Sequence, residues 1–162
     1  MAGHAGHAAA RVAARVSATA DGYRVWTNAS GGYVLKRGKP PGTTFSTTMT
    51  SVAGRQQRNG FILLSGGDPR RTMVRAGIEF GARSLTVIGP GGMRKRGSKK
   101  IQWDGKSPVE VTVTVDFKAH KLTAVALGQR VEVDLPEAWT ELTASGYGAS
   151  NAETEFTKLV TK

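Results

Sequence analysis

A glycine-rich loop with a dense run of positive charges is the feature of this sequence best suited to binding a ligand. The loop covers residues 89–100, and Arg70, Arg71, Arg75 and Arg83 precede it. The cationic residues concerned are Arg71, Arg75, Arg94, Lys95, Arg96, Lys99 and Lys100. A guanidinium group pairs bidentately with a sulfate, phosphate or carboxylate, and a lysine adds a point charge. The loop therefore predicts a site for an anionic polymer, with a solvated loop that only aids solubility as the alternative.

An amide and an aromatic side chain follow the basic loop directly. The ring of Trp103 could stack on the C–H face of a sugar or on a base, and Gln102 could hydrogen-bond sugar hydroxyls. The alternative for Trp103 is packing in the core, because tryptophan is highly buried on average. We include both residues in the predicted ligand-binding site.

Residues that bind metals or cofactors are sparse. The chain has no cysteine, and its three histidines, His4, His7 and His120, are too scattered to suggest a zinc site. The glycines at 89–92 do not make a phosphate-binding loop, because no helix is predicted to follow them. The sequence therefore predicts neither a metal site nor a cofactor.

The net charge of +11 is concentrated in the middle of the 162-residue chain. Residues 23–107 carry a net charge of +13, whereas residues 108–162 carry −3. A positive field attracts polyanions, so the expected partner is an anionic polysaccharide, with nucleic acid as the alternative. No apolar run approaches the roughly 20 residues of a membrane helix, and we predict no membrane span.

The amino-acid composition of the sequence changes near Tyr23. Residues 1–22 are rich in alanine and lack the apolar core of a secretory signal, so we expect a flexible leader or linker. From Tyr23 onward, valines, threonines and closely spaced glycines are typical of strands and turns. We expect residues 23–162 to form one β-domain.

Strict alternation identifies the clearest strand. In residues 109–117 the odd positions are apolar and the even positions are polar, which is the pattern of a half-buried strand. Reversals at 118–121 and 128–129 then predict a three-stranded meander. Further short strands are predicted at 43–52, 59–65, 71–80, 83–88 and 99–103. Roughly ten such strands without helical periodicity predict an all-β fold, an antiparallel two-sheet sandwich.

Five segments resemble a known family when they are taken together. They are 31–36, 58–67, 74–80, 111–117 and 146–156. They are similar to the concanavalin A-like lectin/glucanase (LamG-like jelly-roll) domains appended to secreted sulfatases and related hydrolases of planctomycete-type bacteria. The resemblance covers about residues 23–162 and implies a carbohydrate-contacting accessory role beside a catalytic domain in a larger parent chain. It also implies a secreted or periplasmic parent, although a cytoplasmic location stays open, and it carries over no catalytic residue.

Glucanases of the same fold carry their catalytic carboxylates at the spacing E-x-D-x-x-E, which Glu132, Asp134 and Glu137 match. A retaining glycosidase needs two of these groups about 5 Å apart. Pro136 ends the strand before Glu137, so an exposed strand edge explains the same residues. We keep a glycoside hydrolase using Glu132 and Glu137 as an alternative.

The main hypothesis is a non-catalytic module that binds a sulfated or acidic polysaccharide through the basic loop. Besides the hydrolase, the alternatives are a nucleic-acid or general polyanion binder, and a docking domain whose charge serves only solubility. We predict that the chain is not an enzyme.

Overall fold

The computed structural model describes residues 14–27, 31–54, 56–91 and 94–162. Apart from the short helix α2 (Pro69–Thr72), the regular elements of these residues are strands. They are β1 (Ala14–Ala18), β2 (Gly22–Thr27), β3 (Gly32–Arg37), β4 (Thr44–Gly54), β5 (Asn59–Ser65), β6 (Val74–Glu79), β7 (Ser84–Ile88), β8 (Lys95–Lys100), β9 (Val109–Asp116), β10 (Lys121–Ala126), β11 (Gln129–Asp134), β12 (Ala144–Ala149), β13 (Ala152–Thr157) and β14 (Val160–Thr161). No helix in the described ranges is long and apolar enough to cross a membrane.

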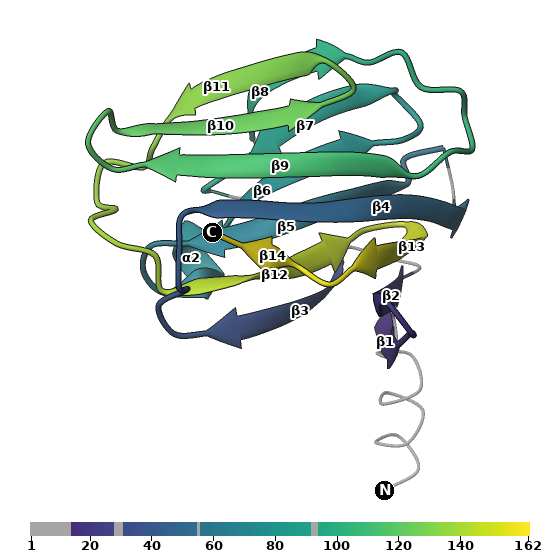
Figure 1. Cartoon of the computed structure of the whole chain (residues 1–162), viewed down its shortest axis with the longest axis horizontal. Coiled ribbons are helices and arrows are strands. Elements are labelled where there is room, and N and C mark those ends of the chain that lie inside the picture. The colour runs from purple at the N-terminus through teal and green to yellow at the C-terminus, as the bar shows by residue number, and fades with distance from the viewer. Residues whose placement is uncertain (1–13, 28–30, 55, 92–93) are drawn as a thin grey trace, which may run out of the picture.

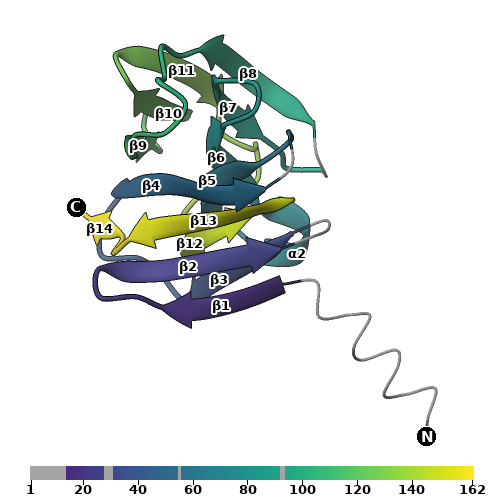
Figure 2. The same ribbon diagram turned by 90° about the vertical axis from the view of Figure 1, so that its right-hand side faces the viewer.

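The strands form two antiparallel sheets that pack against each other (Figure 1). Sheet A has the order β1-β2-β13-β4-β9-β10-β11, with β14 paired to β4, and sheet B has the order β3-β12-β5-β6-β7-β8. Figure 2 shows β1, β2, β13 and β4 side by side in sheet A. The predicted fold class, an antiparallel two-sheet β-sandwich, is confirmed.

The hydrophobic core lies between the two sheets. Val111 and Val113 of β9 are fully buried and join one apolar cluster with Ile62, Ile78 and Leu85 of sheet B. Each such side chain contributes about 1.5–3 kcal/mol when it leaves water. The alternation that predicted β9 therefore corresponds to a real division between a core face and a solvent face.

The predicted meander is present. Strand β10 pairs with β9 on one side and with β11 on the other, both in antiparallel register. Strands β6 and β7 follow each other in the chain and also form a hairpin, since they pair across a turn that contains Gly81 and Ala82. These elements depend on local alternation and turn residues, which the sequence displays directly.

Two predicted strands have different bounds. The prediction for 71–80 is wrong at its start, because α2 occupies Pro69–Thr72 and β6 begins only at Val74. Proline favours the first turn of a helix, and the amide groups of Arg71 and Thr72 donate to the Asp68 carbonyl at 2.9 and 3.0 Å. The basic strand is β8 at 95–100 rather than 99–103, so the second half of the predicted loop is strand.

The sandwich starts earlier than predicted. Residues 1–13 lie outside the described part of the chain, but β1 lies within the segment that we expected to be a leader. It pairs with β2, and the Arg15 guanidinium carbon lies 4.7 Å from the centre of the Trp26 ring. A cation over an aromatic ring stabilises this edge pairing, which composition alone does not reveal.

Candidate functional site

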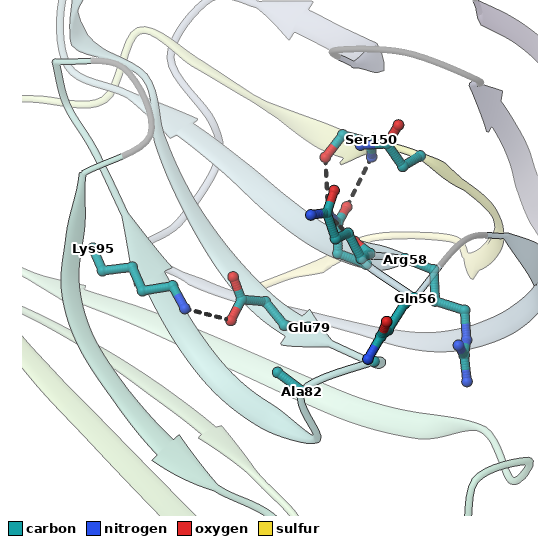
Figure 3. Close-up of a pocket in the computed structure, with 10 residues that line it drawn as sticks. Gln56, Arg58, Glu79, Ala82, Lys95 and Ser150 are labelled. Atoms are coloured by element: carbon teal, nitrogen blue, oxygen red, sulfur yellow. Dashed lines mark hydrogen bonds and ion pairs between the residues drawn. The ribbon is translucent and has the colours of Figure 1, made fainter.

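A polar pocket of about 600 Å³ lies at the end of sheet B where three turns meet. The turns connect β4 to β5, β6 to β7 and β12 to β13, and the first residue of β8 borders the same space. The lining residues are Gln56, Gln57, Arg58, Asn59, Glu79, Gly81, Ala82, Lys95, Ser150 and Asn151 (Figure 3). Amides, a carboxylate, a guanidinium and an ammonium thus surround one cavity.

Asn59 holds one wall of this pocket in place. Its side chain is buried, and its Nδ2 donates to Ser150 Oγ at 2.8 Å while its Oδ1 accepts from the Ser150 amide at 2.8 Å. Nδ2 also donates to the Gln57 carbonyl at 3.2 Å. The Thr154 hydroxyl donates to the Asn59 carbonyl at 2.7 Å. These bonds tie the start of β5 to the turn between β12 and β13.

A glycine allows two of the turns to approach each other. A Cβ atom on Gly81 would lie 1.4 Å from the carbonyl oxygen of Gln56, so any side chain there would displace the β4–β5 turn. The Phe80 amide donates to the Arg58 carbonyl at 2.9 Å and fixes the same approach. The position of Gln56 beside the β6–β7 turn therefore depends on Gly81.

The opposite wall carries an ion pair. Lys95 Nζ lies 2.9 Å from Glu79 Oε2, and the Thr86 hydroxyl donates to the same oxygen at 3.3 Å. The Glu79 side chain is only 19% exposed, so its interactions are less screened than those of a surface pair. Figure 3 shows the Lys95 and Glu79 side chains pointing toward each other, with Ser150 across the pocket. Both contacts involve Oε2, and among the described residues Oε1 makes no hydrogen bond or ion pair.

Three further polar side chains of the wall keep their hydrogen-bonding capacity for a ligand. Within the described residues, Gln56, Gln57 and Arg58 make no side-chain hydrogen bond or ion pair. Each amide can donate and accept at the same time, and the guanidinium can donate five hydrogen bonds. The pocket therefore combines one held carboxylate with unengaged donors and acceptors.

An aromatic side chain continues this surface across sheet B. Tyr33 is 57% exposed and lines a small hollow with Phe61, Arg75 and Ser150, the last of which also lines the polar pocket. The strand register places Tyr33 opposite Gly148, and Gly148 opposite Phe61. Burial lowers the pKa of the Arg75 guanidinium below its ordinary value. An exposed ring and a half-buried cation thus lie next to the pocket.

The structure separates the residues that we predicted to form one basic site. Only Lys95 lines the polar pocket, while Lys100 borders it by donating from Nζ to the Ala82 carbonyl at 2.6 Å. Arg96 lies toward sheet A, where its charge helps to lower the pKa of Asp134, an effect that comes mainly from a hydrogen bond with Lys121. The other predicted residues are the exposed Arg71, Arg94, Lys99 and Gln102, and Arg75 beside Tyr33.

The predicted role of Trp103 as a stacking surface is wrong. Its ring is 5% exposed and packs against Phe80, with ring centres 5.0 Å apart. Its indole Nε1 donates to the Ser107 carbonyl at 2.8 Å. The Arg83 guanidinium carbon lies 6.0 Å from its ring centre and covers it further. Trp103 therefore belongs to the core, because this packing removes its ring from any ligand.

Of the carboxylates considered for glycoside hydrolysis, Glu132 and Asp134 lie on β11, the edge strand of sheet A, and Glu137 lies in the exposed turn that follows it. Glu132 Oε2 accepts from Arg130 Nη2 at 2.9 Å, and this bond lowers the Glu132 pKa. A lowered pKa suits an ionised carboxylate and not the general acid of a glycosidase, which must hold a proton at neutral pH. In the part of the chain that the structure describes, no three His, Asp or Glu side chains gather in a way that could hold a metal ion.

Most residues of the pocket carry no signal in the sequence that marks them as a site. Asn59 and Ser150 are hydrogen-bonded to each other although they are 91 positions apart in the chain. The one local signal was polarity at turns, in the run Gln56-Gln57-Arg58-Asn59 before an apolar strand and in Ser150-Asn151 between two strands. Such runs occur in most surface turns, so they did not point to a site.

Comparison of the sequence with known protein families and with curated proteins finds no match. The fold, however, is similar to solved structures. Carbohydrate-binding module CBM66 from Bacillus subtilis matches with a TM-score of 0.76 at 9% identity, over 90% of this chain and 89% of that chain. A tetrameric galectin from the ball sponge Cinachyrella matches with a TM-score of 0.55 at 13% identity, over 79% and 99%. Chicken galectin 2 matches with a TM-score of 0.53 at 10% identity, over 80% and 100%.

At these identities the likeness shows the fold alone, a jelly-roll β-sandwich of the kind found in lectins. The jelly-roll part of the resemblance seen in the sequence is therefore confirmed. The link to planctomycete sulfatases stays a prediction.

Proposed function

We propose that this chain is a carbohydrate-binding module that holds a glycan, without catalysis, on the exposed face of sheet B. The observation that carries the proposal is the polar pocket, where Glu79 and three unengaged side chains surround one cavity next to the exposed ring of Tyr33. The similar structures, a carbohydrate-binding module and galectins, support the same class of ligand.

The chemistry of the pocket suits a sugar. Each hydroxyl of a sugar ring can both donate and accept a hydrogen bond. Side-chain amides do the same, while a carboxylate accepts and a guanidinium group donates. The C–H face of a sugar packs on an aromatic plane, which Tyr33 offers beside the pocket. Pockets of about 300–1,000 Å³ are typical of small-ligand sites, and this one falls in that range.

The charge around this face supports an acidic glycan. Arg58, Arg75, Lys95 and Lys100 line or border the pocket and the hollow beside it, and Glu79 is the acidic residue among their lining side chains. The chain as a whole carries +11. Such a field favours uronate or sulfated polymers over neutral ones, and guanidinium groups pair directly with carboxylates and sulfates. An accessory role in a larger secreted hydrolase is part of this proposal and rests on the resemblance seen in the sequence.

A glycan array tests the class of ligand, and the Glu79→Gln variant tests the site. We expect binding to an acidic glycan, and a loss of about thirtyfold in affinity, about 2 kcal/mol, when Glu79 loses its charge-assisted hydrogen bonds. The substitution also raises the net charge by one, so a protein that binds polyanions through charge alone would bind as well or better. The control is Glu137→Gln, an exposed residue that does not line the pocket, with the same change in charge.

Two results would contradict the proposal. If Glu79→Gln binds the glycan as tightly as the parent and the control do, the pocket is not the site. If an oligonucleotide competes with the glycan on equal terms, the protein is a general polyanion binder.

A further inference from the structure

A second cleft, of about 480 Å³, opens between the two sheets away from the polar pocket. Strand β12 connects the two places, since Ser145 lines the cleft and Ser150 lines the pocket. Ser150 directly follows the end of β12 and is five positions from Ser145, a distance of about 16 Å along an extended chain. The cleft is further bordered by the end of β3, by the loop at 38–41 and by Lys158 and Leu159 before β14.

The inner wall of the cleft is aromatic and held in place. The rings of Tyr23 and Tyr147 lie 5.9 Å apart, and both line the cleft. The Tyr147 hydroxyl donates to the Thr157 carbonyl at 3.0 Å and accepts a hydrogen bond from the Leu159 amide. Burial raises the Tyr147 pKa, so the hydroxyl stays protonated at neutral pH. This wall is apolar and fixed before any ligand arrives.

The outer wall is cationic. Lys36, Arg37, Lys39 and Lys158 all line the cleft, and no acidic side chain does so among the described residues. Lys39 has a partner in Glu141, but the distance is 3.9 Å and both side chains are mostly exposed, so the pair is weak. The Lys158 amide donates to the Asp21 carbonyl at 2.6 Å, which fixes the backbone at that residue. Four positive charges therefore border an aromatic cleft with little compensation from the protein itself.

We propose that this cleft is a second binding site, and that it takes a sugar residue bearing a carboxylate or a sulfate ester. The lysines and the arginine bind the acidic group, while Tyr23 packs against the sugar ring. The cleft has the volume of a small-ligand site rather than the extended surface that a nucleic acid backbone needs. It uses none of the residues of the polar pocket, so the inference goes beyond the function proposed above.

Two sites on one module would raise the affinity for a polymer. When one acidic unit of a polysaccharide occupies the cleft, the next contact is intramolecular and benefits from a high effective concentration. Short oligosaccharides that reach only one site would bind more weakly than long chains. The strength of binding should therefore rise with chain length beyond what a single site gives.

The test uses ¹⁵N-labelled protein titrated with three tetrasaccharides: a galacturonate, a sulfated galactan and the neutral galactan. We expect the two acidic probes to shift the amide signals of Gly38, Ser145 and Leu159, and the neutral probe to leave these signals in place. The first two probes distinguish a carboxylate site from a sulfate site. The amide spectrum of each variant also reports whether it is folded.

A pair of double variants assigns the cleft. We expect Lys36→Gln with Lys158→Gln to weaken the acidic probe at the cleft about tenfold, because two charged contacts are lost. The control, Lys106→Gln with Lys118→Gln, loses the same charge at exposed residues outside both sites.

Equal binding by the two double variants, or shifts confined to β8 and the polar pocket, would overturn the inference. Competition by an oligonucleotide at these amides would also overturn it. The Glu79→Gln variant distinguishes the two proposals, because it should leave the cleft signals unchanged.

Discussion

Replacing Asn59 with alanine is expected to destabilise the fold by about 2 kcal/mol. The substitution removes three side-chain hydrogen bonds, two with Ser150 and one with the Gln57 carbonyl. Each such bond contributes about 1 kcal/mol. Gln57 is exposed and its carbonyl can bind water instead, so the two bonds with the half-buried Ser150 account for most of the loss.

Urea unfolding followed by tryptophan fluorescence measures this effect. With an m-value of about 2 kcal/mol/M for a domain of this size, the midpoint should fall by about 1 M. The melting temperature should fall by about 4–8 °C. Gln57→Ala is the control, because its exposed side chain should change the free energy of unfolding by less than about 0.5 kcal/mol. Equal midpoints for the two variants would refute the role of Asn59 as the link between the β4–β5 and β12–β13 turns.

Two further predictions concern the segment after β8. Trp103→Phe keeps an aromatic ring in the core but loses the hydrogen bond to Ser107, so unfolding should become about 1 kcal/mol easier while glycan affinity stays that of the parent. A fall in affinity without a change in stability would contradict this. Hydrogen bonds from the Ser107 hydroxyl and amide and from a second amide lower the pKa of Asp104 from 3.8 to about 2. The stability that Asp104 contributes should be complete above pH 4 and disappear as the pH falls toward 2, so the difference in unfolding free energy between the parent and Asp104→Asn should shrink over that range.

The fold was predictable because its information is local. Strand β9 and the meander that follows it could be predicted from alternation over eight residues and from two turns. The predictions were wrong where another interaction outweighed the local pattern of apolar and polar residues. Helix α2, which begins at Pro69, occupies the start of one predicted strand. The pairing of β1 with β2 is stabilised by a contact between Arg15 and Trp26, which a periodic pattern cannot predict.

The polar pocket was not predictable for the opposite reason. Its walls come from three turns and one strand edge, and the contacts that assemble them join distant parts of the chain, as Asn59 and Ser150 illustrate. Gly81 is a second example. The sequence marks it as a turn residue, but the close approach of Gln56 that requires a glycine exists only in the folded sandwich. Polar residues in turns indicate a site only when the order of the strands shows which turns lie together.

Positive residues that follow one another in strand β8 lie on different surfaces of the folded protein. Side chains of a strand alternate between its two faces, so neighbours in sequence do not share a surface. Lys95 reaches Glu79 on the pocket side of β8, whereas the next residue, Arg96, acts on Asp134 at the edge of sheet A. A charge count along the chain treats these two cations as one patch. The structure assigns them to different surfaces, so the ligand preference of the protein depends on which cations flank a cavity and not on how many follow one another.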